Sequence, residues 1–223
     1  IAATRAREVV VVDAGLLTPR IAASRRRATT LRERVAVGGR RLLGLHTAAP
    51  ARVTFFTAYD LDVCAPDRVV RHRFEGLRAQ RSGHADVDEA WFIGQNFVEG
   101  TMMSAERYEA FIAAAIAGRD RVRYVAHPRE EDARLEVLRR RFGVEVTRFV
   151  NPIEIELTER PWPKEIVGVS SAALHSAALI AGDAVAVRAL RARDGDLLRF
   201  NAGMPDVYNQ LASVGVKIVE GPA

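Results

Sequence analysis

Tyr124-Val-Ala-His-Pro-Arg-Glu130 is the stretch that sets the expected fold, because an apolar run gives way at once to polar residues and a proline. Two later stretches repeat this change, Asn151-Pro-Ile-Glu-Ile-Glu156 and Val167-Gly-Val-Ser-Ser-Ala-Ala-Leu174. Each indicates a strand that ends in a turn or a helix. Parallel strands of an open sheet bind ligands at their carboxyl ends. The three polar segments therefore predict one site for a polar, phosphorylated ligand.

The second half of the chain alternates between apolar runs and helical patterns. The expected strands are residues 90–94, 122–126, 144–149, 165–169, 184–190 and 215–219, and the expected helices are residues 104–118, 130–141, 170–181 and 205–214. Such alternation predicts parallel pairing and an α/β fold. Right-handed crossovers place the carboxyl end of every strand on the same edge of the sheet.

The first half of the chain predicts a smaller α/β unit. Residues 9–13 are expected to form a buried strand, and residues 52–57 and 68–74 two more. Residues 77–88 are polar and without periodicity, which favours a linker. The expected domains are therefore residues 1–80 and residues 81–223.

Composition limits the classes of protein that fit. With 223 residues, 48% of them hydrophobic, the chain can bury a full core, and no apolar run is long enough to span a bilayer. Cys64 is the only cysteine, which excludes an internal disulfide and fits a cytoplasmic location. The net charge of +5 favours an anionic partner. Residue 1 is Ile rather than Met, so we expect sequence to precede it.

Residues 20–41 carry eight arginines against one acid, Glu33. The segment lacks the interleaved aromatic residues of a single-strand nucleic-acid platform, so no nucleic-acid partner is predicted. A polyanionic acceptor, or peripheral contact with the inner face of the cell membrane, fits better. A solvated basic helix explains the same charges equally well.

His127-Pro128 follows the expected strand at residues 122–126. Proline is tolerated in the first helical turn, so Pro128 is expected there, with His127 held extended at the sheet edge. An imidazolium at this place could donate a hydrogen bond to phosphate and protonate a leaving group. The alternative is a surface histidine that precedes a helix.

Ser170-Ser171 lies between an apolar strand and a helix. Two hydroxyls beside free helix N–H groups suit an anion, although plain N-capping explains one of the serines. The segment also resembles the nucleophile elbow of a serine hydrolase. That fold needs an acid and then a histidine downstream of the serine. The only downstream histidine, His175, lies one turn further along the same helix, which argues against a hydrolase.

Two carboxylates also end predicted strands. Asp13 closes a run of four valines, where burial is costly, so a role as general base is as plausible as a structural one. Glu154 follows Asn151-Pro152, where a carboxylate can accept ribose hydroxyls, or can simply be solvated. Three scattered Asp-x-Asp pairs suggest chance, and no metal site is predicted.

Together these segments resemble the bacterial sialyltransferases and polysialyltransferases of the GT-B type. That family carries an acidic-acidic-Gly motif in its first domain and His-Pro and Ser-Ser motifs in its second. The counterparts here are Asp13-Ala-Gly15, His127-Pro128 and Ser170-Ser171. The likeness covers residues 90–190 and, thinly, residues 8–18. It departs from the family at Ala14, where a second acid is expected.

The resemblance implies a GT-B-like fold, with a Rossmann-like nucleotide domain and a partial acceptor domain. It implies transfer of sialic acid from CMP-sialic acid to an anionic glycan or glycolipid acceptor during capsule or surface polysaccharide synthesis, with inversion and without metal or cofactor. Asp13 would be the general base, and His127 would assist departure of CMP. The substrate-binding positions would be Gly94, Gln95, Pro128, Glu154, Ser170 and Ser171. The alternatives are a GT-B enzyme for another nucleotide sugar and a non-catalytic polyanion-binding member.

Overall fold

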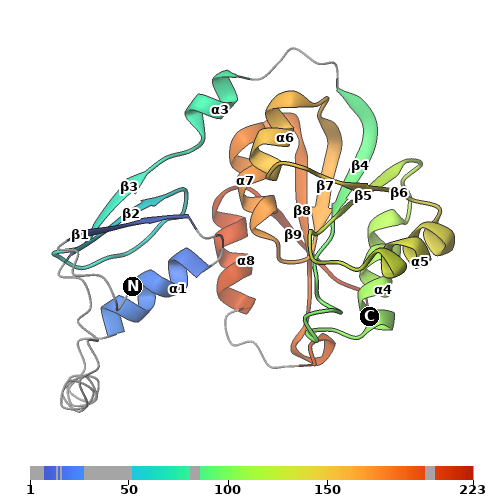
Figure 1. Cartoon of the computed structure of the whole chain (residues 1–223), viewed down its shortest axis with the longest axis horizontal. Coiled ribbons are helices and arrows are strands. Elements are labelled where there is room, and N and C mark those ends of the chain that lie inside the picture. The colour runs from blue at the N-terminus through green and yellow to red at the C-terminus, as the bar shows by residue number, and fades with distance from the viewer. Residues whose placement is uncertain are drawn as a thin grey trace. The chain divides into compact units, whose positions relative to one another are not determined.

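The chain divides into two units in this computed structural model, Ile1–Arg73 and Phe74–Ala223 (Figure 1). The structure describes residues 8–13, 15, 17–27, 52–80, 86–198 and 204–222. Each unit holds a parallel sheet with helices, so the predicted α/β class is confirmed, and its character is Rossmann-like. In the described part of the chain, none of the helices combines the length and the apolar character that crossing a bilayer requires.

The second unit is built on a six-stranded parallel sheet with the order β6-β5-β4-β7-β8-β9. Its strands are β4 (Val87–Ile93), β5 (Val122–Ala126), β6 (Glu145–Arg148), β7 (Pro163–Gly168), β8 (Ala186–Arg191) and β9 (Lys217–Glu220). The chain starts at the centre with β4, moves outward to β6, and then returns to place β7 beside β4. The direction of strand addition thus reverses between β4 and β7, the position where open α/β sheets bind ligands.

Helices cover both faces of this sheet. They are α4 (Ala105–Ile116), α5 (Asp132–Phe142), α6 (Ile153–Glu159), α7 (Ala172–Ala181) and α8 (Met204–Ser213). In Figure 1, α4 and α5 lie on one side of the sheet and α6, α7 and α8 on the other. Eight of the ten residues of α7 are buried, which its nearly uninterrupted apolar sequence requires.

Local sequence signals set the helix ends. Ser104 begins α4, because its hydroxyl accepts the N–H of Arg107 at 3.2 Å. Gly143 ends α5 in the left-handed conformation, with φ of 63°. The expected helix at residues 130–141 starts later than predicted, at Asp132, so the prediction that Pro128 lies in its first turn is wrong.

The segment expected to be a linker is partly ordered structure. Helix α3 (Glu75–Ala79) lies against α6 and α7, and β4 already begins at Val87. The division between the units falls before α3, at Arg73 and Phe74.

The first unit is a three-stranded parallel sheet in the order β1-β2-β3, with one described helix. Its elements are β1 (Glu8–Val12), α1 (Leu17–Arg27), β2 (Arg52–Thr57) and β3 (Arg68–Arg71). Ala22 of α1 packs with Val53 and Phe55 of β2 in a small core. β1 is not the fully buried strand that its valines predicted, because an edge strand with one covered face leaves alternate residues exposed, here Val10 and Val12.

Part of the arginine-rich segment has a structural role. Arg25 of α1 donates to Asp67 at 2.6 and 2.8 Å, and the same carboxylate accepts the N–H of Val53 at 2.9 Å. The guanidinium of Arg25 holds the pKa of Asp67 below its ordinary value. Arg25 therefore fastens α1 to the sheet. The remainder of the predicted membrane-contact segment, residues 28–41, lies outside the described residues.

Candidate functional site

The centre of the candidate site is a pair of hydrogen bonds across the point where strand order reverses. Gln95 follows β4, and Ser170 follows β7. The Gln95 side-chain oxygen accepts the N–H of Ser170 at 3.0 Å, and its amide nitrogen donates to the Ser170 hydroxyl oxygen at 3.5 Å. Gln95 thus fastens the two loops to each other, and its amide is committed to Ser170.

The two adjacent serines have different partners. Ser171 is the N-cap of α7, and its hydroxyl oxygen accepts the N–H of Ala173 at 3.2 Å. The capping interpretation is therefore confirmed for Ser171, whereas Ser170 accepts from Gln95. Both hydroxyl oxygens act as acceptors within the protein, and neither hydroxyl proton has an acceptor among the described residues. Two donors remain beside a helix N-terminus, which carries partial positive charge.

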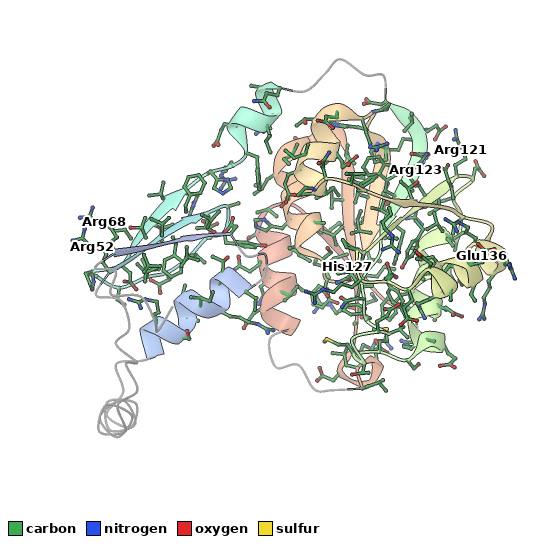
Figure 2. All side chains as sticks on the ribbon, in the orientation of Figure 1. Arg52, Arg68, Arg121, Arg123, His127 and Glu136 are labelled. Atoms are coloured by element: carbon green, nitrogen blue, oxygen red, sulfur yellow. The ribbon has the colours of Figure 1, made fainter. Side chains whose placement is uncertain are left out.

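His127 lies at the end of β5, next to β4 in the sheet (Figure 2). Its Nδ1 accepts the main-chain N–H of Arg129 at 3.1 Å, so the neutral ring carries its proton on Nε2. Burial, together with the charge of Arg129, lowers the pKa of His127. The structure therefore favours a neutral imidazole that donates through Nε2, in place of the imidazolium predicted from the sequence.

The turn that carries His127 is held from the neighbouring strand. Glu130 N–H donates to the carbonyl of His127 at 3.0 Å, which closes a four-residue turn with Pro128 in its second position. Arg148, at the end of β6, donates to the carbonyls of His127 and Glu130, each at 2.9 Å, and to Asp132 at 2.8 Å. This guanidinium orients the turn and adds positive charge beside the imidazole.

A buried carboxylate lies beneath the same turn. Glu130 is 3% exposed, and it accepts the Tyr124 hydroxyl at 2.5 Å and the N–H of His127 at 2.6 Å. Burial raises the pKa of Glu130 to about 7, in spite of these hydrogen bonds. Burial likewise raises the pKa of Tyr124, which therefore stays protonated.

The Glu130 carboxylate leaves no room for a side chain at position 94, which is a glycine. A Cβ atom at position 94 would stand 2.6 Å from a carboxylate oxygen of Glu130 and 2.8 Å from the hydroxyl of Tyr124. The end of β4 can pass over Glu130 only without a side chain. The sequence suggested that Gly94 lies near a nucleotide, and the structure adds a packing reason for a glycine there.

Two of the predicted residues stand apart from this cluster. Glu154 lies in the first turn of α6 and has no hydrogen-bond partner among the described residues. Its neighbour Glu156 is the engaged carboxylate, since it accepts the N–H of Asn151 at 3.0 Å and pairs with Arg160. Glu156 therefore fixes the start of α6, and Glu154 is left half-buried.

Asp13 belongs to the first unit, at the carboxyl end of β1. One carboxylate oxygen accepts the N–H of Ala58 at 2.7 Å and lies 3.5 Å from Nε2 of His72. The other oxygen is buried and has no hydrogen-bond partner among the described residues. Ala58 and His72 follow β2 and β3, so Asp13 sits at the shared carboxyl edge of this smaller sheet.

A hollow of about 170 Å³ lies elsewhere on the second unit, toward the start of β5. Its lining includes Glu89, Trp91, Arg121, Arg123 and Arg160 but none of the predicted site residues. Figure 2 labels Arg121 and Arg123 at the opposite end of the sheet from His127. Within the described residues, His, Cys, Asp and Glu side chains form no group of three or more suited to a metal ion.

Comparison of the chain with models of known protein families and with curated protein sequences finds no match. The grounds for a function are therefore the geometry of the carboxyl edge and the resemblance of its motifs.

The sequence indicated no role in the site for Glu130 or Arg148. The sequence predicted Glu130 only as the first residue of a helix over residues 130–141. The available signal was its place in a fixed turn, three residues after His127. Arg148 gave no signal, because its partners come from a different strand.

Proposed function

We propose that this protein is a GT-B glycosyltransferase that transfers sialic acid from CMP-sialic acid to a glycan or glycolipid acceptor. One observation carries the proposal. At the carboxyl edge of the sheet, Ser170, Ser171 and His127 each use an acceptor atom within the protein and leave a donor for something else. A set of hydrogen-bond donors suits a phosphate group.

The donors suit the chemistry of a departing nucleotide. During transfer, the bond between the anomeric carbon of sialic acid and a CMP phosphate oxygen breaks, and the electron pair leaves with CMP. Hydrogen bonds from the two hydroxyls and from Nε2 of His127, together with the N-terminus of α7, stabilise the charge on that phosphate. The charges of Arg129 and Arg148 beside His127 add to the attraction.

The acceptor hydroxyl must lose its proton as it attacks the anomeric carbon from the opposite face, which inverts that centre. Asp13 is the proposed base, because it matches the first acidic position of the family motif and lies at the carboxyl end of β1. Ala58 N–H and His72 orient the other oxygen. Ala14, at the second acidic position of the family motif, does not remove this base. Glu154 is the proposed acceptor for the ribose hydroxyls.

A nucleotide panel tests the donor class. Thermal unfolding is followed with CMP, UDP, GDP and cytidine, because a ligand that binds the folded state raises Tm. We expect CMP to raise Tm, and His127→Ala to remove the rise. A rise with UDP or GDP alone would favour an enzyme for another nucleotide sugar. No rise with any nucleotide, combined with retention on a polyanion column, would favour a non-catalytic polyanion-binding protein.

Asp13→Asn tests the base. Asparagine still presents an oxygen to the N–H of Ala58, so we expect the fold and CMP binding to persist while sialic acid transfer is lost. Transfer is measured as release of CMP from CMP-sialic acid in the presence of acceptor glycan. Wild-type turnover in this variant would remove Asp13 from the mechanism.

A further inference from the structure

A chain of buried hydrogen bonds joins the loops after β4 and β5. The N–H of Gln95 donates to the Tyr108 hydroxyl at 2.7 Å, and the hydroxyls of Tyr108 and Tyr124 are 3.2 Å apart. Tyr124 donates to Glu130, so the proton between the two tyrosines comes from Tyr108. Glu130 then accepts the N–H of His127 with its second oxygen.

With Glu130 ionised, every hydrogen bond in this chain has one direction. The main-chain N–H groups of Gln95 and His127 donate hydrogen bonds at the two ends of the network. Tyr108 donates to Tyr124, and Tyr124 donates to Glu130. Buried polar chains of this kind are strong when every member is satisfied and costly when one member is lost. Tyr108 and Tyr124 are both fully buried, so water has no route to replace a missing hydroxyl.

We infer that Glu130 and Tyr124 are positioning residues, which hold the His127 and Gln95 loops in the relative placement that the phosphate donors require. Neither side chain faces the ligand edge, since Glu130 lies beneath Gly94 and Tyr124 packs on Phe92 at 5.5 Å between ring centroids. Gln95 in turn holds Ser170, so the hydrogen-bonded network reaches the loops that carry Gln95, His127 and Ser170. The role in phosphate binding depends on the proposed function.

The surroundings favour a fixed arrangement over a movable one. The guanidinium of Arg134 lies 5.3 Å from the ring centre of Tyr108, and its Nε is 3.8 Å from Glu99. Glu99 also accepts the N–H of Glu131 at 3.3 Å, on the far side of the same turn. Three side chains thus hold the turn. Glu130 accepts the N–H of His127, Arg148 donates to the carbonyl of His127, and Glu99 accepts the N–H of Glu131 just after the turn.

Tyr124→Phe and Glu130→Gln test the inference, with Tyr208→Phe as a matched control. Tyr208 is another buried tyrosine of the same unit, and its hydroxyl accepts the N–H of Ala192 at 2.7 Å outside this chain. Two quantities are measured: amide hydrogen exchange at His127 and Gln95 in the free protein, and the Kd of CMP by calorimetry.

We expect Tyr124→Phe and Glu130→Gln to speed exchange at His127 and to weaken CMP binding by about tenfold, the scale of one lost buried hydrogen bond. Tyr208→Phe should lower Tm to a similar extent and leave both quantities unchanged. Unchanged exchange and CMP affinity in the first two variants, or equal changes in all three, would overturn the inference. If wild-type protein fails to bind CMP, the proposed function fails, and the exchange rates still decide whether the chain holds the loops.

Discussion

Gln95 holds Ser170 with both ends of its side-chain amide, as an acceptor for the N–H at 3.0 Å and as a donor to the hydroxyl at 3.5 Å. This pair lies between the two strands at which the sheet reverses its direction of growth. Because the hydroxyl oxygen of Ser170 is occupied by Gln95, its proton points elsewhere. The amide therefore leaves the Ser170 hydroxyl as a donor for the proposed phosphate.

Gln95→Glu tests that relationship. A carboxylate can still accept the N–H of Ser170 but cannot donate to its hydroxyl, and it brings negative charge to the donor cluster. We expect CMP affinity to fall at least tenfold, since one good charge-assisted contact has about this value, while cytidine binding changes little. Gln80→Glu, at an exposed position in the same unit, controls for the added charge. Equal CMP affinity in the two variants would contradict the assignment.

Ser171→Asp separates the capping role of Ser171 from its role as a donor. Aspartate is as good an N-cap as serine, and its charge favours a helix N-terminus, so we expect Tm to stay level or rise. The same charge repels a phosphate, so CMP binding should be lost. Ser171→Ala removes both the cap and the donor, so we expect it to lose about 1 kcal/mol from the free energy of unfolding and to bind CMP more weakly. Retained CMP binding in Ser171→Asp would show that Ser171 is a cap and nothing more.

The positions of the strands along the chain and their parallel pairing could be predicted from the sequence, because these signals are local. Apolar runs marked all six strands of the second unit, and Ser104 and Gly143 marked helix ends by mechanisms that depend on a few neighbouring residues. Parallel pairing then followed from alternation with helices. The chain direction at each strand brought Gln95, His127 and Ser170 to one edge.

The chemistry of that edge could not be predicted in the same way. The proton position on His127 depends on the N–H of Arg129, which points at Nδ1 only because residues 127–130 form a turn. A helix starting at Glu130 would have exposed that carboxylate. Its hydroxyl partner Tyr124 is held in turn by Tyr108, which comes from α4, a distant part of the sequence. Partners from distant elements leave no periodic signal.

The titration of His127 is a direct check on its neutral state. Burial and Arg129 lower its pKa, so NMR of the free protein should give a midpoint below the ordinary value of 6.5. At neutral pH the ring is then uncharged and donates through Nε2. Bound phosphate favours the charged ring, so saturating CMP should raise the midpoint. Wild-type protein with cytidine in place of CMP provides the control without phosphate, and a midpoint above 6.5 in free wild-type protein would contradict the neutral donor.

Glu130 makes the stability of the fold depend on pH. Its pKa is about 7 in the fold against an ordinary value of 4.5, so the folded protein binds the extra proton between these values. The contribution of Glu130 to the free energy of unfolding is fully present below pH 4.5 and is lost as the pH rises to about 7, at about 1.4 kcal/mol per pH unit.

Glu130→Gln removes this titration while Arg134 and Glu99, the charged neighbours, remain. Denaturant unfolding of both proteins is measured between about pH 4 and 8, the range over which carboxyl and imidazole groups titrate. It gives the difference between their free energies of unfolding directly. We expect wild-type protein to lose stability relative to Glu130→Gln as the pH rises toward 7. A difference that does not vary with pH would show that the pKa of Glu130 is the same in the folded and unfolded protein.

Gly94→Ala tests whether the close approach of β4 to Glu130 holds the loops. The added Cβ would meet Glu130 at 2.6 Å and Tyr124 at 2.8 Å, distances that force one of them to move. We expect a loss of about 1–3 kcal/mol in the free energy of unfolding, as for other overpacked sites, together with faster exchange of the His127 amide. Gly76→Ala is the control, because a Cβ there has nothing within 4 Å and alanine suits its helix. If Gly94→Ala is as stable as Gly76→Ala and its His127 amide stays protected, β4 does not depend on a bare backbone above the carboxylate.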